Sequence, residues 1–502
     1  MGTSTACFVG IAPRGRPYYP TYVTSWSEYE RLFGGLDKTT HLPLAVYHFF
    51  LNGGKKAYIV RLLDPDAETA TGLVALAGGD GSASGELKIV AAGAGQWAND
   101  MRIEFRLSPA GATPRWAGGD EGESGPVLFD IVVMSVVDGE AYEIEIIPRV
   151  GVKEDGERFY ASIINRDSRF IEVDFPEGHD DFPESLFRVD SDSRELVVEL
   201  AGGTDGDAAL ALTKASLDRA LASMDVFDDV NMILLPGETD PVLQEAGISY
   251  ASRRRDMIFI ADGVGDPRNR QPREIQLEGV KNQLKKLAKS SHAALYFPWI
   301  EIADPYSKIS GATRFAPPSG AIAGLYARTD NRRGVWKAPA GTEATILGAV
   351  GVAVSVTDND QETLNPVGIN CIRQFPDSGI VCWGSRTLAT RQDPEYRYVP
   401  VRRFAMFLAK SLYRGTQWVV FEPNDEPLWS SIRFNLNAFM LRQFRSGALQ
   451  GGKPEEAYFV KCDAENNPQA TIDAGQVHVT VGFSPLKPAE FVIIHLTQMR
   501  KE

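Results

Sequence analysis

The sequence predicts an α/β (α+β) core with a mixed sheet, a mostly β inserted outer domain and a C-terminal arm built on one strand. Three observations predict this fold class. From about residue 206, helical and apolar strand patterns alternate, as in layered cores with parallel strands. Residues 67–205 are acidic and glycine-rich and show strand alternation with few helical periods. The last strand pattern, near residue 491, is apolar on both faces.

These changes of character divide the chain into four expected parts. We expect residues 1–66 to be the N-terminal part of the core, 67–205 the outer insertion domain, 206–485 the α/β core, and 486–502 the C-terminal arm.

The first part mixes both kinds of element. A strand pattern, "TACFVGIA", contains Thr5, Ala6, Cys7, Phe8 and Val9. It is followed by a short helix pattern closed by glycine, "SWSEYERLFGG", and by a second strand, "KKAYIVRLLD".

The second part contains five strand patterns bounded by glycine and acidic residues. They are "ELKIVAA", "MRIEFRL", "LFDIVVMSVV", "AYEIEII" and "RFIEV".

The third part repeats a helix followed by an apolar strand. The pairs are "DAALALTKASLDRALASM" with "VNMILLPG", "PVLQEAGISYASRRR" with "MIFIADG", and "REIQLEGVKNQLKKLAKS" with "HAALYFPWIEI". Later segments predict a helix at "VRRFAMFLAKSLYRG", a strand at "WVVFEPN", a long helix from about Leu428 to Leu449, and three closing strands.

The long helix carries one apolar stripe at helical spacing, which usually means core packing. Arg442 and Arg445 project from the opposite face, and Arg433 falls inside the stripe and therefore needs a partner. The stripe consists of Trp429, Ile432, Leu436, Phe439, Met440 and Phe444.

Composition excludes several classes of protein. With 502 residues, of which 43% are hydrophobic, the chain can bury a large core. A formal charge of −14 argues against a general nucleic-acid binder, although Arg253, Arg254 and Arg255 leave a local basic patch open. Four cysteines without CxxC spacing and the absence of a secretory signal pattern predict folding in a reducing cytoplasm. No apolar run approaches the length of a membrane span.

Short motifs for phosphate or metal binding are incomplete. "GALQGGKP" (447–454) fits GxxxxGK but has proline where Ser or Thr must hold Mg²⁺, and it follows a helix. "DGVGDP" (262–267) lacks the third glycine of a dinucleotide fingerprint. "GHDD" (178–181) is typical of an exposed acidic loop, and His292 and His495 lie in strand patterns. We therefore expect no cofactor, no metal and no catalytic site.

Two segments each admit two interpretations. In "PPSGAIAGLYARTDNRRGVWKAPAG" (317–341), Arg328, Arg332 and Arg333 would form an anion clamp beside Asp330 as an acid or base, or the segment is a capped helix held to neighbouring protein.

The C-terminal strand places Phe491, Ile493 and His495 on one face. Val492, Ile494 and Leu496 lie on the other. A strand that is apolar on both faces must be covered, either as an internal last strand or by insertion into its own or a neighbour's sheet.

The ordered series of such segments resembles the tail sheath protein family of contractile phage tails, phage-tail-like bacteriocins and extracellular contractile injection systems. Apart from 317–341, the blocks that carry the resemblance are "FFLNGGKKAYIVRL", "AAGAGQWANDMRI", "LAGGTDG", "AALYFPWIEIADP", "LNPVGINCIRQFP", "VCWGSRTLA", "YRYVPVRRF", "WVVFEPNDEPLW", "GALQGG" and "SPLKPAEFVIIHLTQ".

The resemblance implies a structural subunit that stacks with other copies as hexameric rings around an inner tube and contracts to drive that tube through a target envelope. Implied partners are the tube protein, the baseplate, the tail terminator or cap and sheath paralogues, without nucleic acid or direct membrane insertion. The particle would assemble in the bacterial cytoplasm and be part of a phage tail or a released phage-tail-like particle. The alternatives are a specialised sheath copy at the baseplate or cap end, and an α/β enzyme.

The resemblance also implies roles for individual residues. Phe491 to Leu496 match the strand that relatives donate to a neighbouring subunit, and the long helix with Arg442 and Arg445 is the candidate for the tube-facing surface. Relatives carry an N-terminal arm before the strand at Thr5 to Val9, so we expect this arm to be shortened or replaced by a paralogue.

The block at 317–341 would form a capped helix and a loop in the core near subunit contacts. Pro317 and Pro318 would end a strand, and Ser319 would cap a helix running to about Arg328. The other residues of this core block are Gly320, Arg332, Arg333, Gly334 and Trp336.

Overall fold

The structure is a computed structural model, and its chain divides into two compact units. The first unit contains residues 1–8, 45–57 and 227–502, and the second contains residues 9–44 and 58–226. The residues that the structure describes are 2–77, 83–107, 128–137, 139–151, 158–174, 195–265 and 272–490.

A buried sheet forms the centre of the first unit. The strands of this sheet that lie in the first unit follow the order β18-β17-β13-β12-β11-β1, and all neighbours among them are parallel except β17 and β18. The inner strands are apolar on both faces, as a parallel sheet covered on both sides requires. The strands are β1 (Ala6–Ile11), β11 (Met232–Leu234), β12 (Ile258–Asp262), β13 (Ala293–Phe297), β17 (Ile369–Phe375) and β18 (Gly379–Cys382).

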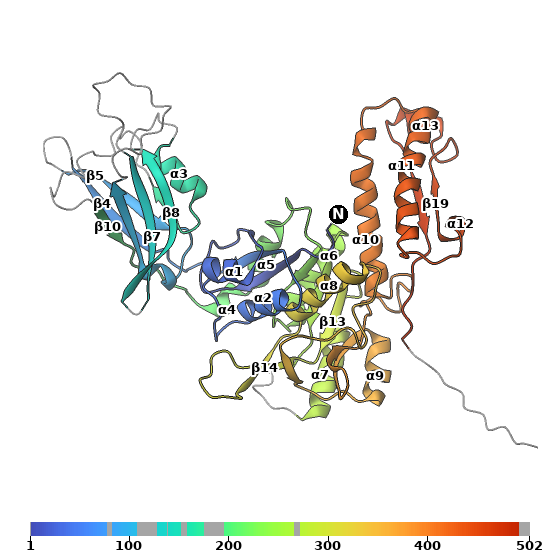
Figure 1. The fold of residues 1–502 in the computed structure, drawn as a ribbon, viewed down its shortest axis with the longest axis horizontal. Coiled ribbons are helices and arrows are strands. Elements are labelled where there is room, and N and C mark those ends of the chain that lie inside the picture. Colours follow the sequence, from blue (N-terminus) through green and yellow to red (C-terminus); the bar gives the residue numbers. More distant parts are fainter. Residues whose placement is uncertain are drawn as a thin grey trace, which may run out of the picture. The chain divides into compact units, whose positions relative to one another are not determined.

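Helices connect and cover these strands in the predicted alternation. Helices α6 (Pro241–Arg254) and α7 (Arg273–Lys286) connect β11 to β12 and β12 to β13, while α8 (Ser319–Arg333) contacts β11 and β12 (Figure 1). A small sheet, in the order β15-β14-β16, joins β13 to α8 and continues beyond it. It consists of β14 (Ile300–Ala303), β15 (Thr313–Ala316) and β16 (Ala349–Val352).

A glycine pair allows α8 to approach helix α2 (Leu42–Leu51) closely. A Cβ atom on Gly320 would lie 2.2 Å from the Ala45 carbonyl oxygen, and one on Gly324 would lie 2.4 Å from the Phe49 carbonyl oxygen. No side chain fits at such distances, so glycine is required at both positions.

The last part of the first unit is a helical hairpin with a two-stranded sheet. Helices α10 (Val399–Gly415) and α11 (Glu426–Arg445) run side by side in Figure 1 and are in contact. The remaining elements here are η5 (Gln417–Val419), α12 (Pro454–Ala457), β19 (Tyr458–Lys461), α13 (Gln469–Asp473) and β20 (Thr480–Phe483).

Two sequence predictions for this hairpin were wrong in detail. The segment "WVVFEPN" forms a 3-10 turn and a loop instead of a strand. The long helix begins at Glu426, where Asp425 accepts a bond from the Leu428 N–H, and ends at Arg445 instead of Leu449. Gly447 has φ +75° two residues beyond that end, which is the usual glycine conformation after a helix.

The second unit is mostly antiparallel β structure, in one sheet of order β10-β6-β7-β8 and one of order β4-β5-β9. The five strands predicted between 67 and 205 form here. The strands are β4 (Thr71–Ala77), β5 (Ala83–Ala91), β6 (Met101–Leu107), β7 (Leu128–Val137), β8 (Glu140–Gly151), β9 (Ile171–Asp174) and β10 (Glu195–Glu199).

The other elements of this unit precede β4 or follow β10 in the sequence, except η1 and α3, which lie between strands of the two sheets. They are β2 (Thr21–Val23), α1 (Trp26–Phe33), most of β3 (Ala57–Leu62), η1 (Gln96–Asp100), α3 (Tyr160–Asp167), α4 (Ala208–Ala211) and α5 (Lys214–Ala222).

Candidate functional site

The glycine-rich block at 317–341 forms α8 and the loop after it. Strand β15 ends at Ala316, directly before Pro317 and Pro318, as predicted. The helix runs to Arg333, one turn beyond the predicted end near Arg328, and Gly334 follows with φ +96°.

Ser319 does not cap this helix, because it is already the first helical residue and Pro318 occupies the cap position. Its N–H and its hydroxyl instead donate to the two oxygens of the Asp262 carboxylate, at 2.8 and 2.7 Å. The Gly237 N–H donates to the same carboxylate at 2.9 Å. Complete burial raises the pKa of Asp262 to about 6 despite these three donors.

The arginines of the block point to different partners. Arg328 donates to the Thr345 carbonyl oxygen, and Arg333 pairs with Glu343 at 2.8 Å. Arg332 is exposed. Because Arg328 is held by a backbone carbonyl and Arg333 by a carboxylate, these two guanidinium groups are already engaged and do not converge on an open anion site, as the clamp interpretation required.

Asp330 joins the N-terminal end of the chain to α10. Its carboxylate receives Arg403 at 2.6 and 2.9 Å and the Thr3 hydroxyl at 2.6 Å. Arg403 also donates to the Thr3 carbonyl oxygen at 2.8 Å and lies 4.6 Å from the centre of the Tyr326 ring. The side chains of Arg403 and Asp330 are only 2% and 5% exposed, so this carboxylate is engaged in a structural pair.

A second buried pair holds the root of the C-terminal segment. Arg386 donates through two nitrogens to the carboxylate of Glu490, with a bond of 2.8 Å from Nε. Asn365 and the Tyr398 hydroxyl donate to the same carboxylate at 3.1 and 3.2 Å. Burial alone would raise the pKa of Glu490, but the donors outweigh it and lower the pKa below its ordinary value.

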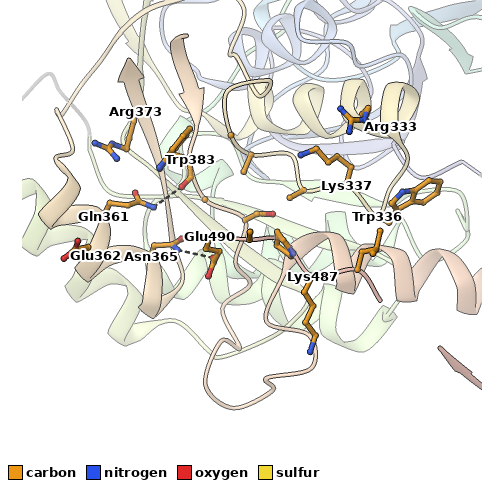
Figure 2. Close-up of a pocket in the computed structure, with 18 of the residues that line it drawn as sticks. Arg333, Trp336, Lys337, Gln361, Glu362, Asn365, Arg373, Trp383, Lys487 and Glu490 are labelled. Atoms are coloured by element: carbon orange, nitrogen blue, oxygen red, sulfur yellow. Dashed lines mark hydrogen bonds between the residues drawn. The ribbon is translucent and has the colours of Figure 1, made fainter. Parts of the chain in front are cut away.

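A cavity of about 910 Å³ opens beside this pair (Figure 2). Its walls come from the loop after α8, from α9 (Asp358–Leu364) and η4 (Asn365–Val367), from the segment after β18, and from residues 486–490. Trp336 and Trp383 contribute indole surface, and Arg333, Lys337 and Arg373 contribute cations. Arg373 is paired with Asp358 at 2.8 Å.

The stripe on α11 packs as predicted. Trp429, Ile432, Leu436 and Met440 are buried, and Arg433, within the stripe, finds a partner in Glu426 at 2.5 Å. Arg442 and Arg445 are both exposed in the last turn.

The two terminal strand predictions have different outcomes. Thr5 to Val9 lead into and form β1, which pairs with β11 with Phe8 opposite Leu234. The donor-strand residues Phe491, Val492, Ile493, Ile494, His495 and Leu496 lie outside the described residues, as does the loop at 178–181.

Other sequence candidates are structural where the structure describes them. His292 is buried, and burial together with Arg402 lowers its pKa to about 4. The four cysteines are buried and free. Arg254 pairs with Asp256 at 3.1 Å, so the run at 253–255 is not a uniform basic surface.

No group of three His, Cys, Asp or Glu side chains within the described ranges is placed to hold a metal ion. None of the described helices is long and apolar enough to cross a membrane.

Sequence reasoning missed the cavity and both buried pairs as sites. The residues involved nevertheless lie in quoted blocks far apart in sequence, since Asn365 belongs to "LNPVGINCIRQFP", Arg386 to "VCWGSRTLA" and Glu490 to "SPLKPAEF". Residues from three separate blocks therefore meet at one carboxylate, that of Glu490.

Two protein-family models match the chain. Residues 211–388 match the phage tail sheath protein central domain, and residues 391–498 match the phage tail sheath C-terminal domain. Together the two matches cover more than half of the chain.

Curated relatives are tail sheath proteins. The protein of Vibrio phage KVP40 is 30% identical over 191 residues, which are 38% of this chain and 27% of that protein. That of Enterobacteria phage T4 is 28% identical over 38% of this chain and 28% of its own length. The protein of Burkholderia phage BcepMu is 28% identical over 40% of this chain and 41% of its own length. The chain thus spans about a quarter of the length of the first two relatives.

Solved structures show a similar fold over nearly the whole chain. A sheath tail protein from Listeria innocua has a TM-score of 0.62 at 13% identity and covers 97% of this chain and 96% of its own. The PVC sheath complex of an extracellular contractile injection system, in the contracted state, has a TM-score of 0.59 at 21% identity. The match covers 99% of this chain and 92% of that chain. The contracted helical sheath of the anti-feeding prophage has a TM-score of 0.58 at 23% identity, with 99% and 94% covered.

Proposed function

Because the chain belongs to the phage tail sheath family, we propose that it is the structural subunit of a contractile sheath, stacked with other copies as hexameric rings around an inner tube. The observation that carries the proposal is the match to both the central and the C-terminal sheath domains, in order along the chain. The work of contraction would come from a difference in packing between two assembled states. We assign the chain no catalytic role.

A sheath subunit must keep its links to its neighbours while copies slide. We propose that residues 491–496 are donated to a neighbouring copy, where main-chain hydrogen bonds resist separation. The buried pair of Glu490 and Arg386 supports this role, because it fixes the root of that segment to the core. The pair of Asp330 and Arg403 fixes the N-terminal end in the same unit through Thr3. A force that pulls on the segment at Thr3 or on the segment after Glu490 would therefore be resisted by a buried ion pair in the core.

The particle we propose has an inner tube, a baseplate and a cap as further partners, assembles in the bacterial cytoplasm and is part of a phage tail or phage-tail-like particle. Within the subunit, the exposed guanidinium groups of Arg442 and Arg445 on α11 are the proposed contact to an acidic tube surface.

Electron microscopy of the chain expressed alone and with its genomic neighbours tests the assembly. We expect hollow striated tubes, wide when the chain is alone and narrower when a tube fills them. Small uniform particles under both conditions would contradict the proposal.

Charge reversal tests the tube contact. Arg442→Glu with Arg445→Glu should reduce tube-filled sheaths while empty wide tubes still form. The matched control, Lys285→Glu with Lys286→Glu, makes an equal change of net charge on exposed residues of α7. It should assemble like the parent. Equal yields of filled sheaths from both double variants would reject α11 as the tube-facing surface.

A further inference from the structure

A second cavity, of about 530 Å³, lies within the second unit. Its walls come from the loops at 17–18 and 63–69, from strands β4, β5 and β9, and from helix α5. Proline, alanine, valine and leucine side chains supply much of the lining, and the volume lies within the range of small-molecule pockets. The cavity therefore has the size and the walls of a ligand site, and its charged side chains indicate the charge of the ligand.

Tyr18 presents Arg219 to this cavity. The Arg219 guanidinium lies over the Tyr18 ring, 4.2 Å from the ring centre, and both residues line the cavity. A guanidinium stacked in this way keeps its edge free, and that edge matches two oxygens of a carboxylate or a phosphate. Within the described ranges, the Arg219 side chain forms no hydrogen bond and no ion pair. Its N–H donors are therefore available to a ligand.

The backbone of Tyr18 is strained, which fixes its ring in advance. Its φ of +56° lies in the left-handed region, which a residue with a bulky side chain rarely adopts. The Tyr18 N–H donates to the Arg61 carbonyl oxygen at 2.9 Å, and the Tyr18 hydroxyl donates to the Leu63 carbonyl oxygen at 2.7 Å. Strained residues of this kind gather at ligand-binding sites, where the strain holds a group in position. The stacking surface for Arg219 is thus formed before any ligand arrives.

The charged side chains of the lining favour an anion. Lys88 on β5 is exposed and forms no ion pair with any residue that the structure describes. The two carboxylates of the lining are already engaged. Glu172 pairs with Arg16 at 2.8 Å, and Asp64 accepts two backbone N–H groups, at 3.1 and 2.6 Å. The charges that remain for a ligand are therefore those of Lys88 and Arg219.

A buried guanidinium lies behind the same wall. The Arg61 side chain donates at 2.9, 2.9 and 2.7 Å to three carbonyl oxygens, and its residue is only 1% exposed. The acceptors belong to Ala12, Gly15 and Ala94, of which Ala94 lines the cavity. Among the described residues, no carboxylate lies within ion-pair distance of Arg61. Because carbonyl oxygens solvate a cation without neutralising it, Arg61 adds to the positive potential at this wall.

We propose that this cavity binds a small organic anion, whose carboxylate or phosphate group lies against Arg219 and Lys88. Its apolar part packs along the wall formed by Val90, Ala91 and Ala92. Such a ligand contacts β5 and α5 at once, and so holds the sheet of order β4-β5-β9 to α5 within the second unit. The site does not depend on the proposed sheath assembly.

Saturation-transfer NMR of the full chain with four probes that share a benzene ring tests the charge preference. Benzoate and phenyl phosphate carry the two candidate head groups, whereas benzyl alcohol is uncharged and benzylamine is a cation. We expect at least one of the anions to bind at least tenfold more tightly than the alcohol and the amine, and the tighter anion identifies the head group. Equal affinity for all four probes, tightest binding of the alcohol or the amine, or no binding of either anion would overturn the proposal.

Arg219→Gln tests whether the anion binds in this cavity. Arg219 is exposed, so the variant should keep the urea midpoint of the parent while its affinity for the preferred anion falls at least tenfold. Arg219→Lys keeps the charge but loses the planar fork, and its affinity should lie between those two values. The matched control, Arg166→Gln, removes an exposed arginine of α3 outside the lining and should bind like the parent. Parental affinity in Arg219→Gln, or an equal loss in both glutamine variants, would reject the cavity as the site.

Discussion

The Arg403 guanidinium lies against both carboxylate oxygens of Asp330, at 2.6 and 2.9 Å, between helices α10 and α8. Both side chains are almost completely buried, and Thr3 completes the contact through its hydroxyl and its carbonyl oxygen. The pair thus connects three segments that are far apart in sequence.

Breaking this pair from one side should be strongly destabilising. Arg403→Met leaves the Asp330 carboxylate buried without its cation, which we expect to lower the free energy of unfolding by about 3–5 kcal/mol. Urea denaturation followed by tryptophan fluorescence measures the loss. Glu343→Gln serves as the control, because it breaks the exposed pair with Arg333 and should cost less than about 1 kcal/mol. Equal losses of unfolding free energy in the two variants would show that burial does not determine how much the pair of Arg403 and Asp330 contributes to stability.

Removing the charge of Glu490 should loosen the root of the C-terminal segment. In Glu490→Gln, Arg386 loses its bidentate partner, and amide hydrogens around 484–490 should exchange at least tenfold faster in hydrogen-exchange mass spectrometry. Because the folded state lowers the pKa of Glu490, its contribution to stability is present above the unfolded value near 4.5 and is lost as pH falls through the folded value. Acidification of the parent through the folded value should therefore lower the protection of these amides relative to their intrinsic exchange rate at each pH, and a variant with parental protection at neutral pH would contradict this role.

Replacing Gly320 by alanine should destabilise the fold, because α8 packs closely against the backbone of Ala45 at this position. In Gly320→Ala the new methyl group would meet the backbone of Ala45 at 2.2 Å, so α8 must shift, at a cost of about 1–3 kcal/mol. Gly415→Ala is the matched control, since Gly415 also lies in a helix and a Cβ there meets nothing within 4 Å. We expect the urea midpoint to fall for the first variant and to stay level or rise for the second. A rise for both would show that helix propensity outweighs the contact.

The fold was predictable where periodicity alone determines the element. The alternation of helices and strands after residue 206 and the buried strands at 258–262 and 293–297 came from apolar patterns that a parallel sheet requires. The prediction for the segment "WVVFEPN" failed because an apolar run does not show by itself that its side chains are buried, and Trp418, Val420 and Phe421 are exposed in a 3-10 turn and loop.

The buried contacts were not predictable from one sequence. Ser319 matched the pattern of a helix cap, but Asp262, 57 positions earlier, takes both of its donors. Likewise nothing near Glu490 in the sequence indicates Arg386, since the pair depends on how the loop after β18 is placed. Long-range partners follow from the packing of elements, and local patterns carry no information about them.

Asp262 should give the protein an unusual dependence on pH. Its folded pKa of about 6 lies above the ordinary value of 3.8, because burial penalises the charged form. Between these values the folded state binds more protons than the unfolded state, so this group makes stability fall as pH rises from about 4 to 6, by at most about 1.4 kcal/mol per pH unit. Above pH 6 its contribution is constant.

Urea denaturation at a series of pH values, compared between the parent and Asp262→Asn, isolates this contribution. The variant loses an acceptor for Ser319 or Gly237 and should be less stable at every pH, but the difference between the two proteins should shrink as pH rises from 4 to 6, because only the parent is penalised by ionisation. Ser319→Ala is the control, since it removes one donor and keeps the carboxyl group. It should retain a dependence on pH in this window. Parallel stability curves for the parent and Asp262→Asn would mean that the three donors hold the carboxylate ionised throughout.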